Sequence, residues 1–173
     1  MSLWRDLPLA PEEATSDLFL ETFLDSFPPD ETVLVVSCDE LPRRRHHEDS
    51  FTYIVNTSRR REAGTHFVLI AKRADSLIYL DSLNLPYFLH QDIPNFLSLY
   101  AHCDQIRLKH QYQDNDSWYC GFFCLLFAYL LNDSTQDLAY EPLSIRDRIQ
   151  NNCRVLRNLG VVMHAYWRKQ KEA

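Results

Sequence analysis

The stretch THFVLIAKRADSLIYLD, residues 65–81, decides the fold. It contains two apolar runs, 65–72 and 76–81, which are typical of strands, joined by a connection of hairpin length. We therefore predict two strands that lie side by side. His66 stands at the start of the first strand and Asp81 at the end of the second, so both should lie at one end of this pair.

Outside this hairpin the chain alternates between segments that favour strands and segments that favour helices. Short β-branched or alternating runs predict further strands at residues 33–37, expected to be buried, at 51–56 and at 106–113. Apolar residues at helical spacing predict helices between an opening at 10–13 and a stop at 27–30, at 93–102 and at 144–169.

The segment 120–131 is apolar on every side, which is typical of a helix buried in the middle of a domain. Its apolar run is about half as long as a membrane span requires. Helices at both ends of the chain around a mixed sheet indicate an α+β fold. We expect a mixed central β-sheet, this buried helix and flanking helices, in a single domain over residues 1–173.

The composition limits the functions open to the chain. Its three glycines allow no glycine-rich phosphate-binding loop. The net charge of −6 argues against a protein that works mainly by binding nucleic acid, although arginine triplets stand at 43–45 and 59–61. Five cysteines without a CxxC motif indicate reduced thiols and no metal site. With no signal peptide in view, we expect the protein inside the cell.

Cys120 is the first candidate for chemistry. It stands where a polar loop, 113–119, enters the buried helix. The first turn of a helix carries partial positive charge and unpaired N–H groups, and both favour a thiolate. Gly121 follows, and its missing side chain lets a substrate carbonyl approach the backbone. The alternative is a buried structural cysteine, which is what we expect of Cys124 one turn further on.

His66, Asp81 and Gln113 could complete a site around this thiol. An adjacent imidazole raises the thiolate fraction, and a carboxylate on its other nitrogen fixes the ring's tautomer and orientation. A side-chain amide can stabilise negative charge on a carbonyl oxygen. Each residue also has a plain structural alternative: the chain holds other histidines, an aspartate often turns the chain at a strand end, and a lone glutamine is a weak signal.

These four residues follow the chain order of one protein family. IVNT at 54–57, AGTHF at 63–67 and QDNDSWYCGFFC at 113–124 resemble segments of the adenovirus protease (adenain) family. The sequence is more remotely similar to the SUMO- and ubiquitin-like-specific proteases of the same clan. The resemblance covers about half of the chain. Phe67 replaces the family's usual Trp, and Asp81 stands where its viral members commonly have Glu.

The resemblance implies a cysteine endopeptidase that cleaves viral structural precursors, often at glycine-containing sites. It implies that Cys120 is the nucleophile, His66 its base and Asp81 the residue that orients the base. Gln113 would contribute to the oxyanion hole. A narrow groove is expected to involve Phe67, Trp118, Tyr119 and Gly121, although Trp118 and Tyr119 are equally typical of core aromatics.

Two other functions remain open in the sequence. One is a protease that removes SUMO or ubiquitin-like proteins, and the other is a non-catalytic virion or interaction protein that keeps the fold. The resemblance also implies an activating viral peptide, disulfide-linked at Cys103, which we expect to be exposed beside His102; the alternative is an ordinary thiol. We expect no required cofactor or metal, little activation by DNA, and a location in the host nucleus, cytoplasm or virion.

Overall fold

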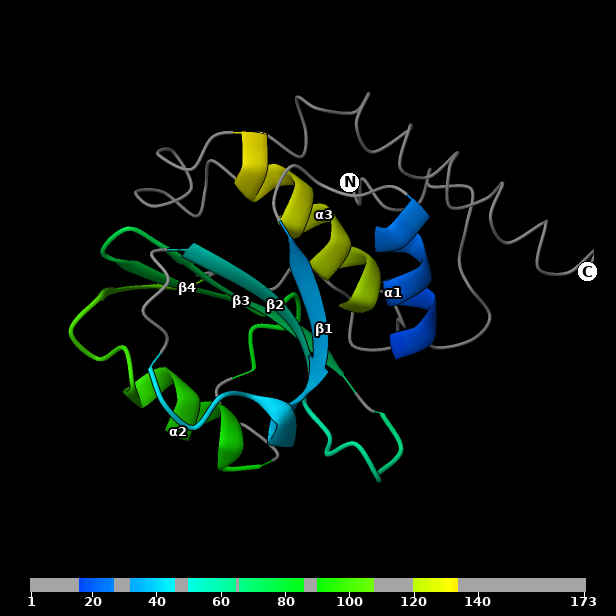
Figure 1. The fold of residues 1–173 in the computed structure, drawn as a ribbon, viewed down its shortest axis with the longest axis horizontal. Helices are drawn as coiled ribbons and strands as arrows, with labels where there is room; N and C mark the ends of the chain where they lie inside the picture. The colour runs from blue at the N-terminus through cyan, green and yellow to red at the C-terminus, as the bar shows by residue number, and fades with distance from the viewer. Residues whose placement is uncertain are drawn as a thin grey trace, which may run out of the picture.

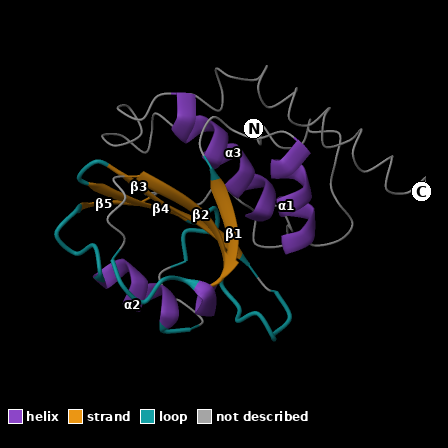
Figure 2. Cartoon of the chain, viewed as in Figure 1, coloured by secondary structure: helices purple, strands orange, loops and turns teal. Residues whose placement is uncertain are grey.

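The structure, a computed structural model, describes residues 16–26, 32–45, 50–64, 66–85, 90–107 and 120–133. Within these residues it is an α+β fold with a five-stranded mixed sheet, as predicted (Figures 1 and 2). The strands are β1 (Val33–Ser37), β2 (Ser50–Asn56), β3 (Phe67–Arg73), β4 (Ser76–Leu80) and β5 (Asp104–Arg107). The helices are α1 (Asp17–Ser26), the 3-10 helix η2 (Cys38–Glu40), α2 (Asp92–Ser98) and α3 (Cys120–Asp133).

The strands lie in the sheet in their order along the chain. β2, β3 and β4 are antiparallel, whereas β1 and β5 run parallel to their neighbours at the two edges. The predicted hairpin is confirmed, because Arg73 pairs with Ser76 across a tight turn. Ala74 in this turn has a φ of 46°, the left-handed conformation that tight hairpin turns require.

The two faces of the sheet bury different helices. Side chains alternate between the faces of a strand, so Ile54 and Leu69 pack with α1 and α3, whereas Tyr53 and Ile70 pack with α2. Figure 1 shows α1 and α3 on one face and α2 on the other. Each large apolar side chain buried in this way stabilises the fold by roughly 1.5–3 kcal/mol. The burial therefore fixes α3, and with it Cys120, against the sheet.

One expectation about the first elements was wrong, and one lies outside the described residues. α1 begins at Asp17, where the Ser16 hydroxyl accepts a hydrogen bond from the Phe19 N–H at 3.1 Å and caps the helix. The opening predicted at 10–13 precedes the described residues. β1 is an edge strand, so it is only partly buried, and Leu34 is 50% exposed. Most of the strand predicted at 106–113 and the whole helix predicted at 144–169 lie outside the described residues.

No helix in the described part of the chain is long and apolar enough to cross a membrane.

Candidate active site

His66 and Asp81 lie at the same end of the central sheet. His66 directly precedes β3 and Asp81 directly follows β4, and these strands are antiparallel, with Leu69 opposite Leu80. The start of one strand and the end of the other therefore meet, as the sequence predicted. Cys120 is the first residue of α3, which packs across β2 and β3.

The imidazole of His66 is hydrogen-bonded to the carboxylate of Asp81. His66 Nε2 lies 2.7 Å from Asp81 Oδ1. The same carboxylate accepts backbone N–H groups from the turn that follows it, Leu83 to Oδ1 at 2.9 Å and Leu85 to Oδ2 at 3.1 Å. Asp81 is buried, so these donors hold it firmly as an acceptor for Nε2–H. Asp81 therefore accepts hydrogen bonds both from a turn of the chain and from the His66 ring.

Cys120 also influences the same imidazole, through the pKa of His66. Burial lowers that pKa, but hydrogen bonds to Asp81 and to the Cys120 thiol raise it, and so does the negative charge of both groups. The net result is a pKa raised from 6.5 to about 9. His66 thus favours the imidazolium form, the charge that pairs with a thiolate.

The second cysteine of α3 has a different environment. Cys124 is fully buried, and burial raises the pKa of its thiol well above the ordinary value, followed by the effect of the neighbouring Cys120. A thiol in this state is a poor nucleophile. The burial of Cys124 agrees with the structural role expected of it.

The structure describes two of the remaining candidate residues and leaves three outside the described residues. Gly121 is buried in the first turn of α3. Phe67 is buried among the side chains of α1 and α3, where it serves the core packing that an aromatic at this position can keep. Gln113, Trp118 and Tyr119 lie outside the described residues.

Cys103 is not exposed, contrary to expectation. It precedes β5 at the predicted junction, but it is only 6% exposed because it packs in the cluster formed by α2 and one face of the sheet. The Cys103 N–H donates a hydrogen bond to the carbonyl of Tyr100, which lies in the same buried cluster. Its Sγ lies 3.4 Å from His102 Nε2, so the predicted proximity of these two side chains is present. A disulfide partner would reach this thiol only after local movement.

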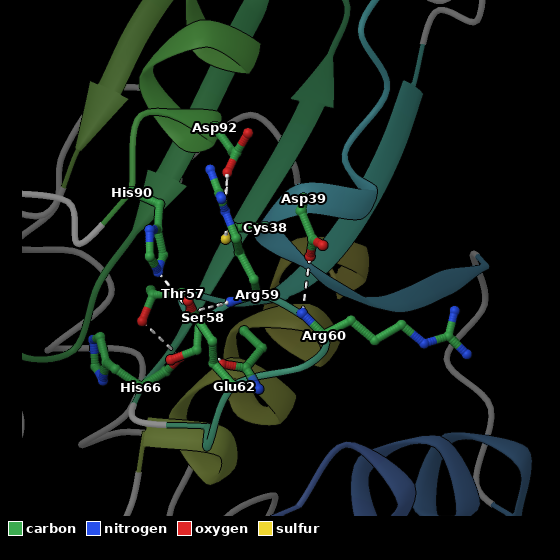
Figure 3. A network of polar contacts seen from close by, with 11 residues as sticks. Cys38, Asp39, Thr57, Ser58, Arg59, Arg60, Glu62, His66, His90 and Asp92 are labelled. Carbon is green, nitrogen blue, oxygen red and sulfur yellow. Dashed lines mark hydrogen bonds and ion pairs between the residues drawn. The ribbon is translucent and has the colours of Figure 1, made fainter.

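A polar network around the loop between β2 and β3 was not found from the sequence (Figure 3). Thr57 donates both its N–H and its hydroxyl to the carbonyl of His66. Further along the loop, Arg59 pairs with Asp92 at 3.2 Å and Glu62 with His90 at 2.7 Å. The last two contacts join residues about thirty positions apart in the chain, so no local sequence pattern predicts them. The IVNT stretch at 54–57 was the only sequence signal that included Thr57.

No protein-family model matches the sequence, and a comparison with curated proteins gives no significant match. Among the described residues, no group of three or more His, Cys, Asp or Glu side chains lies close enough together to hold a metal ion.

Proposed function

We propose that this protein is a cysteine protease with Cys120 as nucleophile, His66 as general base and acid, and Asp81 as the residue that orients His66. One observation carries the proposal: the His66 imidazole is hydrogen-bonded at 2.7 Å to a buried carboxylate and interacts with the thiol at the start of α3. Three residues from separate elements with complementary roles are what nucleophilic catalysis by a thiol requires.

The chemistry would be acyl transfer through a thioester. The Cys120 thiolate attacks the scissile carbonyl carbon, and a C–S bond forms. The imidazolium of His66 then gives its proton to the amine as the C–N bond breaks. In the second half, His66 takes a proton from water, which attacks the thioester and releases the thiolate. Gln113 and the Cys120 N–H are the proposed donors to the oxyanion.

The proposed substrate class and the proposed adenain-like fold rest on the sequence resemblance to adenovirus proteases. That resemblance favours protein substrates with glycine-containing cleavage sites, in viral structural precursors. Glycine fits a narrow groove because it has no side chain, and the same feature would admit the Gly-Gly ends of ubiquitin-like proteins.

The test uses three irreversible probes that end in glycine vinyl sulfone: a peptide with a Gly-x-Gly end, ubiquitin and SUMO. Intact-mass measurement should find one adduct, and peptide mapping should place it on Cys120. Cys120→Ala should remove the adduct, whereas Cys124→Ala, the matched change one turn further along α3, should retain it.

The pattern of labelling decides among the functions. Preference for the peptide probe supports an endopeptidase, and preference for ubiquitin or SUMO would assign the protein to deconjugation. A folded wild-type protein that none of the probes labels would refute a catalytic role and leave a non-catalytic interaction protein.

A further inference from the structure

Thr57 holds the backbone of His66 with two hydrogen bonds. The Thr57 N–H donates to the His66 carbonyl at 2.8 Å, and the Thr57 hydroxyl donates to the same oxygen at 3.2 Å (Figure 3). The first bond extends the ladder between β2 and β3 by one step beyond the pair Asn56 and Phe67. The second bond comes from a buried hydroxyl, so it is directed at this carbonyl within the protein and not at bulk water.

The position of His66 in the chain explains why these two hydrogen bonds matter. His66 lies just outside β3, at the end of the loop that joins β2 to β3, so it is not among the paired residues of that strand. Its ring must nevertheless meet Asp81 and Cys120, which belong to other elements. Only two side-chain torsions separate the ring from the backbone, so a shift of the backbone moves the imidazole with it.

The side chain of Asn56, the residue before Thr57, holds this part of the loop in place. Asn56 donates from Nδ2 to Asp17 Oδ1 at 3.1 Å and accepts the Ser58 N–H on Oδ1 at 3.0 Å. The Asn56 side chain therefore links the backbone on the far side of Thr57, at Ser58, to Asp17 in α1. These bonds fix the backbone at Thr57, and Thr57 in turn fixes the carbonyl of His66.

We propose that Thr57 is a positioning residue, whose hydroxyl fixes the His66 carbonyl so that the imidazole meets Asp81 and Cys120 together. The inference rests on the proposed function, because positioning has a chemical effect only if His66 activates Cys120. It extends the site to a residue that touches neither the thiol nor the carboxylate in any contact described above.

The experiment measures inactivation by the vinyl sulfone probe that labels wild-type Cys120 best, separating the limiting rate kinact from the half-saturation constant KI. Thr57→Val keeps the shape of the side chain and removes the hydroxyl, whereas Thr57→Ser keeps the hydroxyl. Thr22→Val is the matched control, because the Thr22 hydroxyl also donates to a backbone carbonyl, that of Leu18 in α1.

We expect Thr57→Val to lower kinact by roughly 10- to 100-fold with KI little changed, since small misplacements of a catalytic group cost about this much. Thr57→Ser should restore most of the rate, and Thr22→Val should keep it. A folded Thr57→Val protein with wild-type kinact would overturn the proposal. If Thr57→Val does not fold, Thr57→Ala is compared with Thr57→Ser by the same criterion.

Failure of both Thr57→Val and Thr57→Ala to fold would also overturn the proposal, because the hydroxyl would then serve the fold as a whole. Failure of the proposed function is separate and visible in the wild type alone, as the absence of any labelling at Cys120.

Discussion

Two histidines among the described residues are each paired with a carboxylate at the same distance, but the two pairs differ in burial and in their further partners. His66 Nε2 lies 2.7 Å from Asp81 Oδ1, and His90 Nε2 lies 2.7 Å from Glu62 Oε2. The side chains of the first pair are 10% and 4% exposed, and those of the second are 22% and 45% exposed. Distance alone therefore does not distinguish a site from a surface contact.

The surroundings of each pair make the difference. His66 also meets Cys120, and the two partners together raise its pKa to about 9 despite burial. The pKa of Glu62 is lowered, but first by the hydrogen bond from the Arg59 N–H and only later by His90. The exposed pair is thus one of several contacts that hold the loop between β2 and β3, and it adds little to the stability of the fold because solvent screens such exposed pairs. In the buried pair, Asp81 holds a ring that also interacts with the Cys120 thiol.

Removing the two imidazoles should give the largest contrast. We expect His66→Ala to lower kcat/KM for a glycine-ended peptide by roughly 10⁴- to 10⁶-fold, because residues that act as one catalytic unit fail together. His90→Ala should stay near the wild-type value. Circular dichroism should show both variants folded. Equal effects of the two changes on kcat/KM would show that the buried pair has no special role.

Removing the two carboxylate charges should give the next largest contrast. Asp81→Asn keeps the size of the side chain but not its charge, and we expect kcat to fall on the order of 10²- to 10⁴-fold with KM little changed. Glu62→Gln is the matched change in the exposed pair and should leave both kcat and the urea midpoint near the wild-type values. A fall confined to KM in Asp81→Asn would argue against an orienting role.

Much of this contrast could be predicted from the sequence. The apolar runs of β3 and β4 dictated a hairpin, and an antiparallel hairpin brings His66 and Asp81 to one end. The continuous apolar character of α3 dictated its burial and placed Cys120 at its start. Both features follow from patterns of apolar residues within a short stretch of sequence, so they could be predicted without the fold.

Other features depend on contacts that no local pattern records. The burial of Cys103 follows from packing against α2, and its polar neighbours in the sequence suggested the opposite. The second bond from Thr57 to His66 joins the two ends of a loop, so it emerges only with the fold.

Gly64 offers a way to disturb the buried pair without touching it. A Cβ at this position would lie 2.8 Å from Asn56 Nδ2, closer than atoms tolerate, and would push on the amide that holds Asp17 and Ser58. We expect Gly64→Ala to lower the free energy of unfolding by about 1–3 kcal/mol, as overpacking usually does. Urea denaturation measures it, with Ala63→Gly as the neighbouring control. An unchanged midpoint would mean that the loop adapts freely.

The two pairs should lose their stabilising effects at opposite ends of the pH scale. The folded pKa of His66 is raised, so its contribution is complete below its ordinary value of 6.5 and disappears as pH rises through about 9. The pKa of Glu62 is lowered, so its contribution is present above its ordinary value of 4.5 and disappears on acidification.

Urea midpoints across pH measure these contributions as differences from the wild type. The difference between wild type and His66→Ala should narrow between pH 6.5 and about 9, and the smaller difference for Glu62→Gln should narrow only below pH 4.5. If the difference in urea midpoint between wild type and His66→Ala stayed constant from pH 6.5 to about 9, it would contradict the raised pKa of His66.

The most direct test compares two thiols of similar burial that both lie beside an imidazole. Cys120 is 8% exposed and interacts with His66, and Cys103 is 6% exposed and lies beside His102. The measurement is the rate of alkylation by iodoacetamide at neutral pH, followed at both cysteines in one molecule by mass spectrometry. We predict that Cys120 reacts much faster than Cys103 and that His66→Ala abolishes this advantage, whereas His102→Ala leaves it intact. Equal rates at the two cysteines, or a fast Cys120 in the folded His66→Ala protein, would contradict the claim that His66 and Asp81 make Cys120 a nucleophile.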